Sequence, residues 1–266
     1  MKKHLPALRN IVAAVLVGLI GGNTFASEGL SITVGTKSWF NKWTSWDYYA
    51  PTPLSAVESL PGASESFTSS NKSSIIPSLS LRYGDFLATG SVFLKSDYSF
   101  IGSSGAQFKG KRSEVDFHTG YFLLPTLAAT VGYKDVRQDF GSDFKYSGPI
   151  LGFLASAPLT RGFSLYGNFG LGAMKAKFPA GLRDNSGKSR LNADYYLSEI
   201  GLAYSIDARS YIASSKALTA TFGYRSQTLA TKKFAVGTSY FDPAKSRLTE
   251  LRDNTEGLSV GINLTF

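Results

Sequence analysis

The sequence predicts an all-β protein, a transmembrane antiparallel up-and-down β-barrel of about ten strands. Runs of about 10 residues alternate apolar and polar side chains, which is the period and length of a tilted membrane-spanning strand. The connections between these runs alternate long and short, as in transmembrane barrels. Beyond the N-terminal region, no apolar stretch approaches the roughly 20 residues of a spanning helix. A closed barrel is the other fold that satisfies every backbone polar group inside a bilayer.

The N-terminal segment has the pattern of a secretory signal peptide. Basic residues precede the apolar run 11–20, and Thr-Phe-Ala follows at 24–26. The apolar run is shorter than the roughly 20 residues of a spanning helix, so a retained anchor is the weaker alternative. We therefore expect residues 1–26 to be a cleaved signal peptide and residues 27–266 to form one barrel domain.

Ten amphipathic runs follow the signal peptide. Nine of them place apolar side chains on one face, whereas the run 148–157 is apolar on both faces. The central positions of the assigned apolar faces carry no Lys or Arg, which would be costly at the bilayer midplane. The predicted strands cover 30–41, 75–83, 86–97, 114–124, 127–134, 148–157, 163–172, 199–206, 218–225 and 255–266.

Turn residues set the connections. Short turns are predicted at Gly84-Asp85, Pro125-Thr126 and 158–162. The region 44–73, broken by prolines, is predicted to be a long external loop, since proline is excluded from strand interiors. Further long loops are predicted at 99–112, 138–147, 179–192 and 229–254.

The strand number has two alternatives, eight and twelve. Pro77 lacks the donor that a central strand needs, and the connection 207–216 is longer than the other turns and has room for a further strand. With an even number of strands, both termini lie on the periplasmic side.

The last run, 255–266, alternates strictly and ends on Phe266. It resembles the C-terminal strand of the bacterial outer-membrane β-barrel (porin-like) superfamily, which the assembly machinery reads. The resemblance implies export to the outer membrane of a Gram-negative cell, with Phe266 as assembly signal. It also implies contact with the barrel-assembly machinery, outer-membrane lipids and lipopolysaccharide. We expect a monomer.

Composition excludes several function classes. The absence of Cys removes disulfides and thiolate metal sites, and no phosphate loop or metal-ligand spacing occurs, so no cofactor or metal is expected. The formal net charge is +9. Because the chain is exported, we expect its basic loops to meet lipopolysaccharide phosphates rather than nucleic acid; plain solvated loop charge is an equal alternative.

Polar residues on the inward faces define a candidate lumen. Buried charges must be paired, which predicts an interlocking set of salt bridges that plugs the barrel. A narrow polar conduit or binding pocket is the alternative. The predicted lumen-lining residues are Lys37, Arg82, Lys95, Asp97, Glu114, Asp116, His118, Lys134, Glu199 and Arg225.

Glu114, Asp116 and His118 share one strand face, and an acid beside a His can orient an imidazole for general base work. Omptins, the ten-stranded outer-membrane proteases, resemble this chain in strand count and in such an Asp-x-His pair, which implies a protease. However, the chain has no second acidic pair, and no Ser stands beside His118 as it would in a barrel lipid-A deacylase. We therefore expect no enzyme activity, and a hydrolase centred on His118 is the least favoured hypothesis.

Aromatic residues crowd the end of the first run, at Trp39, Trp43, Trp46, Tyr48 and Tyr49. They predict an interfacial belt, with a sugar-stacking platform as alternative. The sequence therefore favours a porin-like or structural envelope protein with a narrow or plugged lumen. The alternative is a surface protein whose loops bind a ligand or mediate adhesion.

Overall fold

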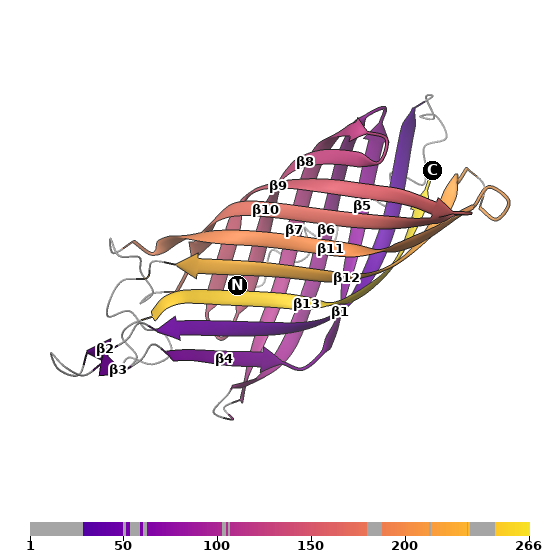
Figure 1. Ribbon diagram of the computed structural model, residues 1–266. Helices are drawn as coiled ribbons and strands as arrows, with labels where there is room; N and C mark the ends of the chain where they lie inside the picture. Colours follow the sequence, from indigo (N-terminus) through magenta and orange to yellow (C-terminus); the bar gives the residue numbers. More distant parts are fainter. Residues whose placement is uncertain are drawn as a thin grey trace, which may run out of the picture.

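The computed structural model is a closed antiparallel β-barrel (Figure 1). It describes residues 29–49, 52–53, 59–60, 63–102, 105, 107–179, 188–212, 214–232, 234 and 248–266. The predicted signal peptide lies outside these residues. Among them, no helix is long and apolar enough to span a membrane.

Ten strands form the ring, and each pairs antiparallel with its neighbours in the chain. The register from Thr33↔Thr265 to Tyr49↔Leu248 joins the first strand to the last and closes the barrel. This confirms the predicted fold class. The ring consists of β1 (Leu30–Tyr49), β5 (Lys72–Tyr83), β6 (Phe86–Gly102), β7 (Gln107–Leu124), β8 (Leu127–Asp139), β9 (Asp143–Thr160), β10 (Phe163–Lys177), β11 (Arg190–Asp207), β12 (Ala217–Lys232) and β13 (Leu248–Thr265).

An additional segment, β4 (Ala63–Ser69), prolongs β5 rather than adding a strand to the ring. Both pair with β1, at Thr44↔Thr68 and Asn41↔Lys72, so that one extra residue is accommodated between them. This is the count of a β-bulge. A two-residue ribbon, β2 (Thr52–Pro53) with β3 (Ser59–Leu60), lies between β1 and β4 in the chain. The alternatives of eight and twelve strands are therefore wrong.

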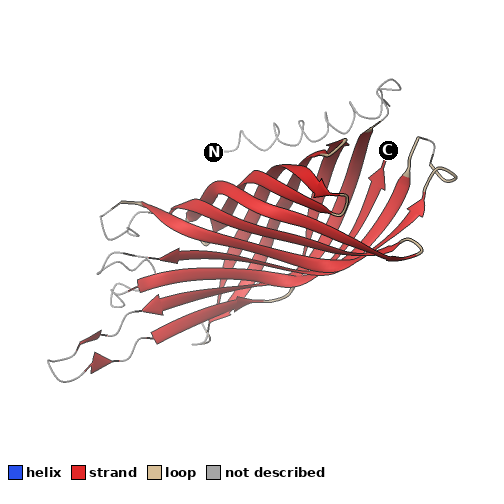
Figure 2. Cartoon of the chain, turned by 45° about the horizontal axis from the view of Figure 1, so that its top comes forward, coloured by secondary structure: helices blue, strands red, loops and turns tan. Residues whose placement is uncertain are grey.

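Both chain ends of the barrel meet at the edge where the short turns lie. Phe266 N–H donates to Ile32 C=O at 2.8 Å, and Ile32 N–H donates to Phe266 C=O at 3.3 Å. Figure 2 shows the C-terminus at this end of the barrel, beside short loops that join neighbouring strands. The connection 208–216 adds no strand in its described residues.

The strands are longer than predicted, mainly at the long-loop end. The predicted turn 158–162 is also too long, because β9 continues to Thr160, which pairs with Phe163. β1 has 20 residues and β13 has 18. Eighteen residues span about 60 Å, or about 45 Å along the barrel axis at the usual tilt, whereas the hydrocarbon layer is about 30 Å thick. The predicted loops 44–73, 99–112, 138–147, 179–192 and 229–254 are therefore wrong in part, because each contains strand residues.

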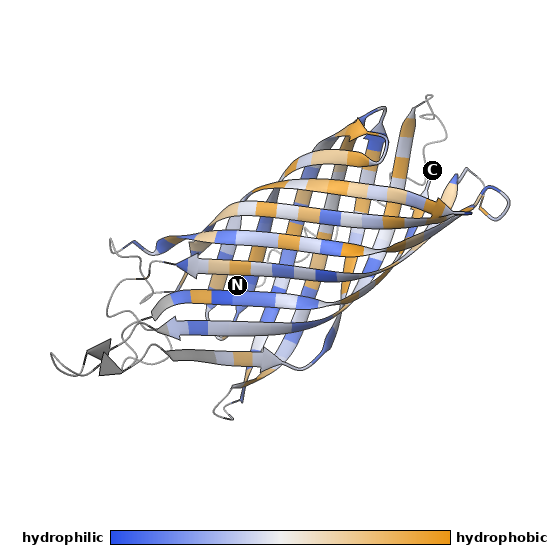
Figure 3. Ribbon diagram, in the orientation of Figure 1, coloured by the Kyte–Doolittle hydropathy of each residue, from blue (hydrophilic) through white to orange (hydrophobic). Residues whose placement is uncertain are grey.

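Outward side chains show where the membrane-spanning half ends. On β13, Leu258, Val260 and Ile262 are exposed apolar residues near the C-terminus. The outward positions nearer the long loop are Glu250, Arg252, Asn254 and Glu256. Figure 3 shows this division over the strands, with apolar residues concentrated toward the end that carries the C-terminus. The apolar half has the surface of a bilayer-spanning band, and the polar half projects beyond it.

Candidate functional site in the barrel interior

Four charged side chains on β7 and β8 form one group inside the barrel. Arg112, Glu114 and Asp116 point inward from alternate positions of β7, and Lys134 faces them from β8. Lys134 Nζ donates to Glu114 Oε2 at 2.6 Å and to Asp116 Oδ1 at 2.7 Å. Arg112 Nε donates to Glu114 Oε1 at 2.7 Å. All four side chains are buried, so these contacts replace the water that the charges lose.

A second group surrounds Glu199 on β11. Arg225 Nη1 of β12 donates to Glu199 Oε2 at 3.1 Å, and Lys37 of β1 forms an ion pair with Glu199 Oε1. Tyr166 and Ser259 donate hydroxyl hydrogen bonds to Oε1, at 3.0 Å and 3.2 Å. This carboxylate of β11 thereby binds groups from four other strands of the barrel.

Gln227 on β12 joins the two groups. Its Nε2 donates to Glu114, and its Oε1 accepts from Arg225 Nη2 at 3.4 Å. Tyr195 O–H donates to the same oxygen at 3.2 Å. The network therefore crosses the lumen from β7 and β8 to β11, β12 and β1. We name it the ionic belt, made of Lys37, Arg112, Glu114, Asp116, Lys134, Glu199 and Arg225.

Aromatic rings contact the cations of the ionic belt. The Arg225 guanidinium lies 5.2 Å from the centre of the Trp39 ring, and Arg112 lies 5.4 Å from Trp43. Lys134 Nζ lies 5.3 Å from the Tyr195 ring. The belt has four cations against three carboxylates, and the negative ring faces offset part of this excess.

The lumen beyond the belt, toward the long loops, is filled with aromatic side chains. Consecutive rings touch at centroid distances between 4.9 and 5.8 Å, and the Phe100 and Phe108 rings are stacked. These rings come from opposite parts of the wall and meet inside the barrel. We name them the aromatic plug, made of Trp43, Phe100, Phe108, Phe140, Phe144 and Phe178.

The aromatic plug corrects the prediction of an interfacial belt. Trp39 and Trp43 have 0% exposure and point into the barrel. Trp46 and Tyr48 alternate with them and face outward, where the Arg252 guanidinium covers the Tyr48 ring at 5.6 Å. The side chain of Tyr49 lies outside the described residues. Strand alternation within the first predicted run already places Trp39 on the face of Lys37, and alternation continued past the end of that run would have placed Trp43 there too.

The structure brings together most of the residues predicted to line the lumen. Lys37, Glu114, Asp116, Lys134, Glu199 and Arg225 lie in the ionic belt. Arg82 lies apart at the short-turn rim, exposed, where Nε donates to Gly84 C=O at 3.0 Å and the guanidinium covers the Phe122 ring at 4.0 Å. Sequence reasoning missed Arg112, which it assigned to a loop, and the neutral partners Gln227 and Tyr195.

Lys95 and Asp97 were predicted to line the lumen, and this prediction is wrong. Both are exposed on the outer face of β6. A bulge shifts the register between Phe93↔Glu114 and Ser96↔Arg112, where three steps on β6 match two on β7. Beyond such a bulge the two faces of a strand are exchanged. Ser96 points inward instead.

His118 is half-buried on the inward face of β7, two residues from Asp116. The Asp116 carboxylate is bound by Lys134 and by Ser91 Oγ at 3.3 Å. His118 packs over Gly132, where an added Cβ would lie 2.5 Å from its Nδ1. In the described part of the chain His118 makes no side-chain hydrogen bond, and no group of three or more acidic, His or Cys residues is placed to hold a metal.

Comparisons with known proteins bear on the fold. No family model and no curated protein sequence matches the chain. The chain is similar to the outer membrane protease OmpT from Escherichia coli, with 12% identity and a TM-score of 0.51 over 92% of this chain and 99% of OmpT. The toluene transporter TodX from Pseudomonas putida also matches, with 8% identity and a TM-score of 0.27 over 91% of this chain and 90% of TodX. The similarity to OmpT supports the fold of an outer-membrane β-barrel for this chain.

Proposed function

We propose that the chain is an outer-membrane β-barrel of the cell envelope with a closed lumen and a structural role. The observation that carries this proposal is the filling of the lumen, by the ionic belt at one level and the aromatic plug at the next. A porin needs a continuous water-filled path, whereas here every belt carboxylate already binds cations or hydroxyl groups. A freely diffusing solute would have to break these contacts.

Single-channel recording in planar bilayers tests the closed lumen. We expect no stable conductance steps from the wild-type protein. Arg225→Ala should also stay closed, because the aromatic plug is untouched by this change. Heat-modifiable migration on gels would show that each sample is a folded barrel. Stable steps with the folded wild type would favour the porin-like alternative and contradict the proposal.

A catalytic role is not part of the proposal. Asp116 is committed to Lys134 and Ser91, so it is not available to orient the His118 imidazole. The sequence identity of 12% to OmpT supports the fold alone. Any hydrolysis that is lost in His118→Ala would overturn this part of the proposal.

A surface-binding role is the second candidate. It is favoured by the projecting half of the barrel, whose outward strand positions carry charged side chains above the apolar band. The connecting region 50–62 follows this half and lies largely outside the described residues. Deletion of 50–62 should abolish capture of a ligand while the barrel still assembles. Unchanged capture would locate binding elsewhere.

A further inference from the structure

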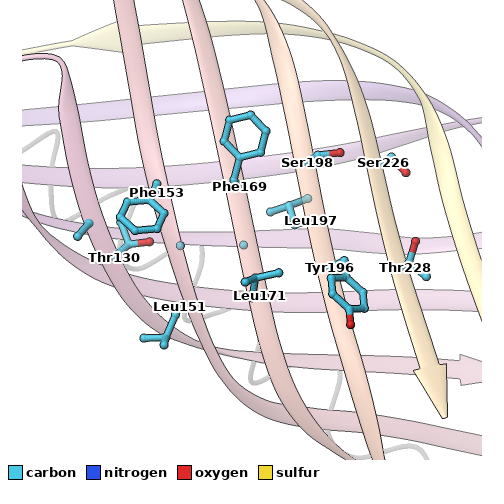
Figure 4. Close-up of a pocket in the computed structure, with 13 residues that line it drawn as sticks. Thr130, Leu151, Phe153, Phe169, Leu171, Tyr196, Leu197, Ser198, Ser226 and Thr228 are labelled. Atoms are coloured by element: carbon cyan, nitrogen blue, oxygen red, sulfur yellow. The ribbon is translucent and has the colours of Figure 1, made fainter. Parts of the chain in front are cut away.

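The outer face of β9, β10 and β11 carries an apolar groove. It has a volume of about 550 Å³ and opens on the side of the barrel that faces away from the lumen (Figure 4). Leu151, Leu171 and Tyr196 lie directly opposite one another on the three strands and form the row of the groove that is nearer the long loops. Phe153 and Phe169 form the next row. These five side chains are between 46% and 65% exposed, so the groove that they line is open on the outside of the barrel.

The floor and edge of the groove differ from its apolar rows. Gly152 and Gly170 are directly opposite each other at the floor and leave it without side chains. Ser198, Ser226 and Thr228 form the edge on β11 and β12. The hydroxyl groups of Ser226 and Thr228 also donate to Asn254 Oδ1, at 3.2 and 3.1 Å. The groove thus has an apolar bed with hydroxyl groups along one side.

A row of cations lies on the same three strands, nearer the long loops. Lys145, Lys177 and Arg190 are directly opposite one another, and Lys175 lies two residues nearer the groove. Like charges in directly opposite positions repel, so the row is unfavourable without a counter-ion. We name these four residues the basic row.

The contacts of the basic row leave part of its charge uncompensated. Lys145 Nζ lies 2.8 Å from Asp135 Oδ2, and Lys175 binds the Asn192 side-chain oxygen. Lys177 and Arg190 are exposed and have no ion-pair partner among the described residues. Asp194 is also exposed on this face, between the groove and the row, and reduces the local charge; it forms no ion pair with another described residue.

The spacing of groove and row matches the layers of a membrane. On β10, Lys175 lies four residues beyond Leu171, which is about 13 Å along the strand and about 10 Å along the membrane normal. Lys177 lies six residues beyond Leu171, which is about 20 Å along the strand and about 15 Å along the normal. Headgroups extend about 5–8 Å beyond each face of the hydrocarbon core. A groove at the top of the apolar band therefore places Lys175 nearest the level of lipid phosphates, and Lys145, Lys177 and Arg190 about 5 Å farther from the hydrocarbon core.

We propose that this face binds one outer-leaflet lipid of the lipopolysaccharide class, with an acyl chain in the groove and its phosphates on the basic row. Arg and Lys are the side chains suited to phosphate, by bidentate geometry and by point charge. The cations of the basic row lie on three neighbouring strands. They therefore fit a headgroup that carries more than one phosphate better than they fit the single phosphate of a phospholipid. The proposal rests on the outer-membrane placement proposed above and adds a specific site to it.

Native mass spectrometry of the purified full-length barrel in detergent, titrated with deep-rough lipopolysaccharide, tests the site. We expect one bound glycolipid on the wild type. Binding should be about 30-fold weaker after Lys177→Glu with Arg190→Glu. The matched control is Lys109→Glu with Lys111→Glu, an equal change on exposed outward positions of β7, which should bind like the wild type. Equal losses in both variants would overturn the site.

Further measurements test the phosphorylated headgroup and the acyl chain of the lipid separately. Dephosphorylated lipid A and phosphatidylglycerol should both bind more weakly than the intact glycolipid, and equal binding of either would overturn the assignment. Ser198→Phe, which fills the groove edge, should weaken binding with the basic row unchanged. A dimer that replaces the lipid adduct would show that a second chain occupies the groove instead.

Two controls separate this proposal from the proposed function. Lys177→Gln with Arg190→Gln provides a milder charge change if the Glu variants do not fold, and it should also lose affinity. Heat-modifiable migration monitors the barrel in every sample. A folded, non-conducting barrel without glycolipid selectivity would overturn the lipid site alone, whereas a conducting barrel that binds the glycolipid would overturn the closed lumen alone.

Discussion

Lys134 on β8 contacts Glu114 on β7 with Nζ at 2.6 Å from Oε2, and both side chains are almost fully enclosed. The pair lies at the centre of the ionic belt, because Lys134 also binds Asp116. Two carboxylates therefore depend on one ammonium group for much of their charge compensation.

Lys134→Met should destabilise the barrel by about 3–5 kcal/mol, since removal of one partner leaves buried charge uncompensated. Urea unfolding in detergent, followed by heat-modifiable migration, would measure the change. Arg137→Ala is the matched control on the same strand, because its ion pair with Asp135 is exposed and should contribute about 0–1 kcal/mol. Equal effects of the two changes would contradict a structural role of the belt.

The bulge in β6 can be tested by thiol labelling, because the chain has no native Cys. Lys95→Cys should react rapidly with a bulky maleimide, since position 95 faces outward. Ser96→Cys should be protected in the folded barrel, since Ser96 is 7% exposed and points inward. Labelling of unfolded samples provides the control. Reversed reactivity would show that the strand continues without the bulge.

The seam between β5 and β6 offers a cross-linking prediction. Backbone pairing between these strands runs only from Ser78↔Ser91 to Tyr83↔Phe86, and Pro77 stands where it stops. Beyond this point Ser96 Oγ donates to Ser74 Oγ at 2.9 Å. Ser74→Cys with Ser96→Cys should therefore form a disulfide on oxidation, seen as faster migration of the denatured chain. Ser74→Cys with outward Lys95→Cys should not, because the two side chains lie on opposite faces of the wall.

Phe266 is predicted to act in assembly. Deletion of Phe266 should lower the amount of folded protein in the outer membrane, measured by fractionation and heat-modifiable migration. Phe163→Ala is the control, because Phe163 is an exposed aromatic at the start of β10 rather than at the chain end. Equal accumulation of the deletion and the wild type would contradict an assembly signal.

Cleavage after Ala26 is a separate prediction from the signal-peptide pattern. N-terminal sequencing of the purified membrane form should begin at Ser27. A membrane form that begins at Met1 would show a retained anchor instead.

The part of the fold that could be predicted from sequence is the part that contacts lipid. There, outward apolar residues such as Leu258 and Val260 alternate with small or polar inward residues, and the period is visible. In the part of each strand that projects beyond the bilayer, the outward and inward residues no longer differ in hydropathy in this way. The segment of β7 that contains Lys109 and Lys111 was therefore predicted to be a loop. Arg112, which lies in the same segment, was for this reason not predicted to line the lumen.

The candidate site was predictable where alternation was unbroken. Glu114 and Asp116 on β7 and Arg225 on β12 followed from the period of two alone. Lys95 and Asp97 did not, since the bulge that turns them outward depends on pairing with β7 and leaves no local turn residue as a signal. Trp39 and Trp43 were assigned to an interfacial belt because Trp suits both a membrane interface and a packed interior.

Closure of the barrel has a consequence for its synthesis. Each neighbouring pair in the ring except one is joined by a connection within the chain, whereas the hydroxyl groups of Thr33 and Thr265 meet 2.9 Å apart across 232 positions of sequence. The first strand must therefore keep an open hydrogen-bonding edge until the last residues have emerged. A nascent chain that stops before β13 presents two unsatisfied edges, and in this state the protein is most exposed to aggregation.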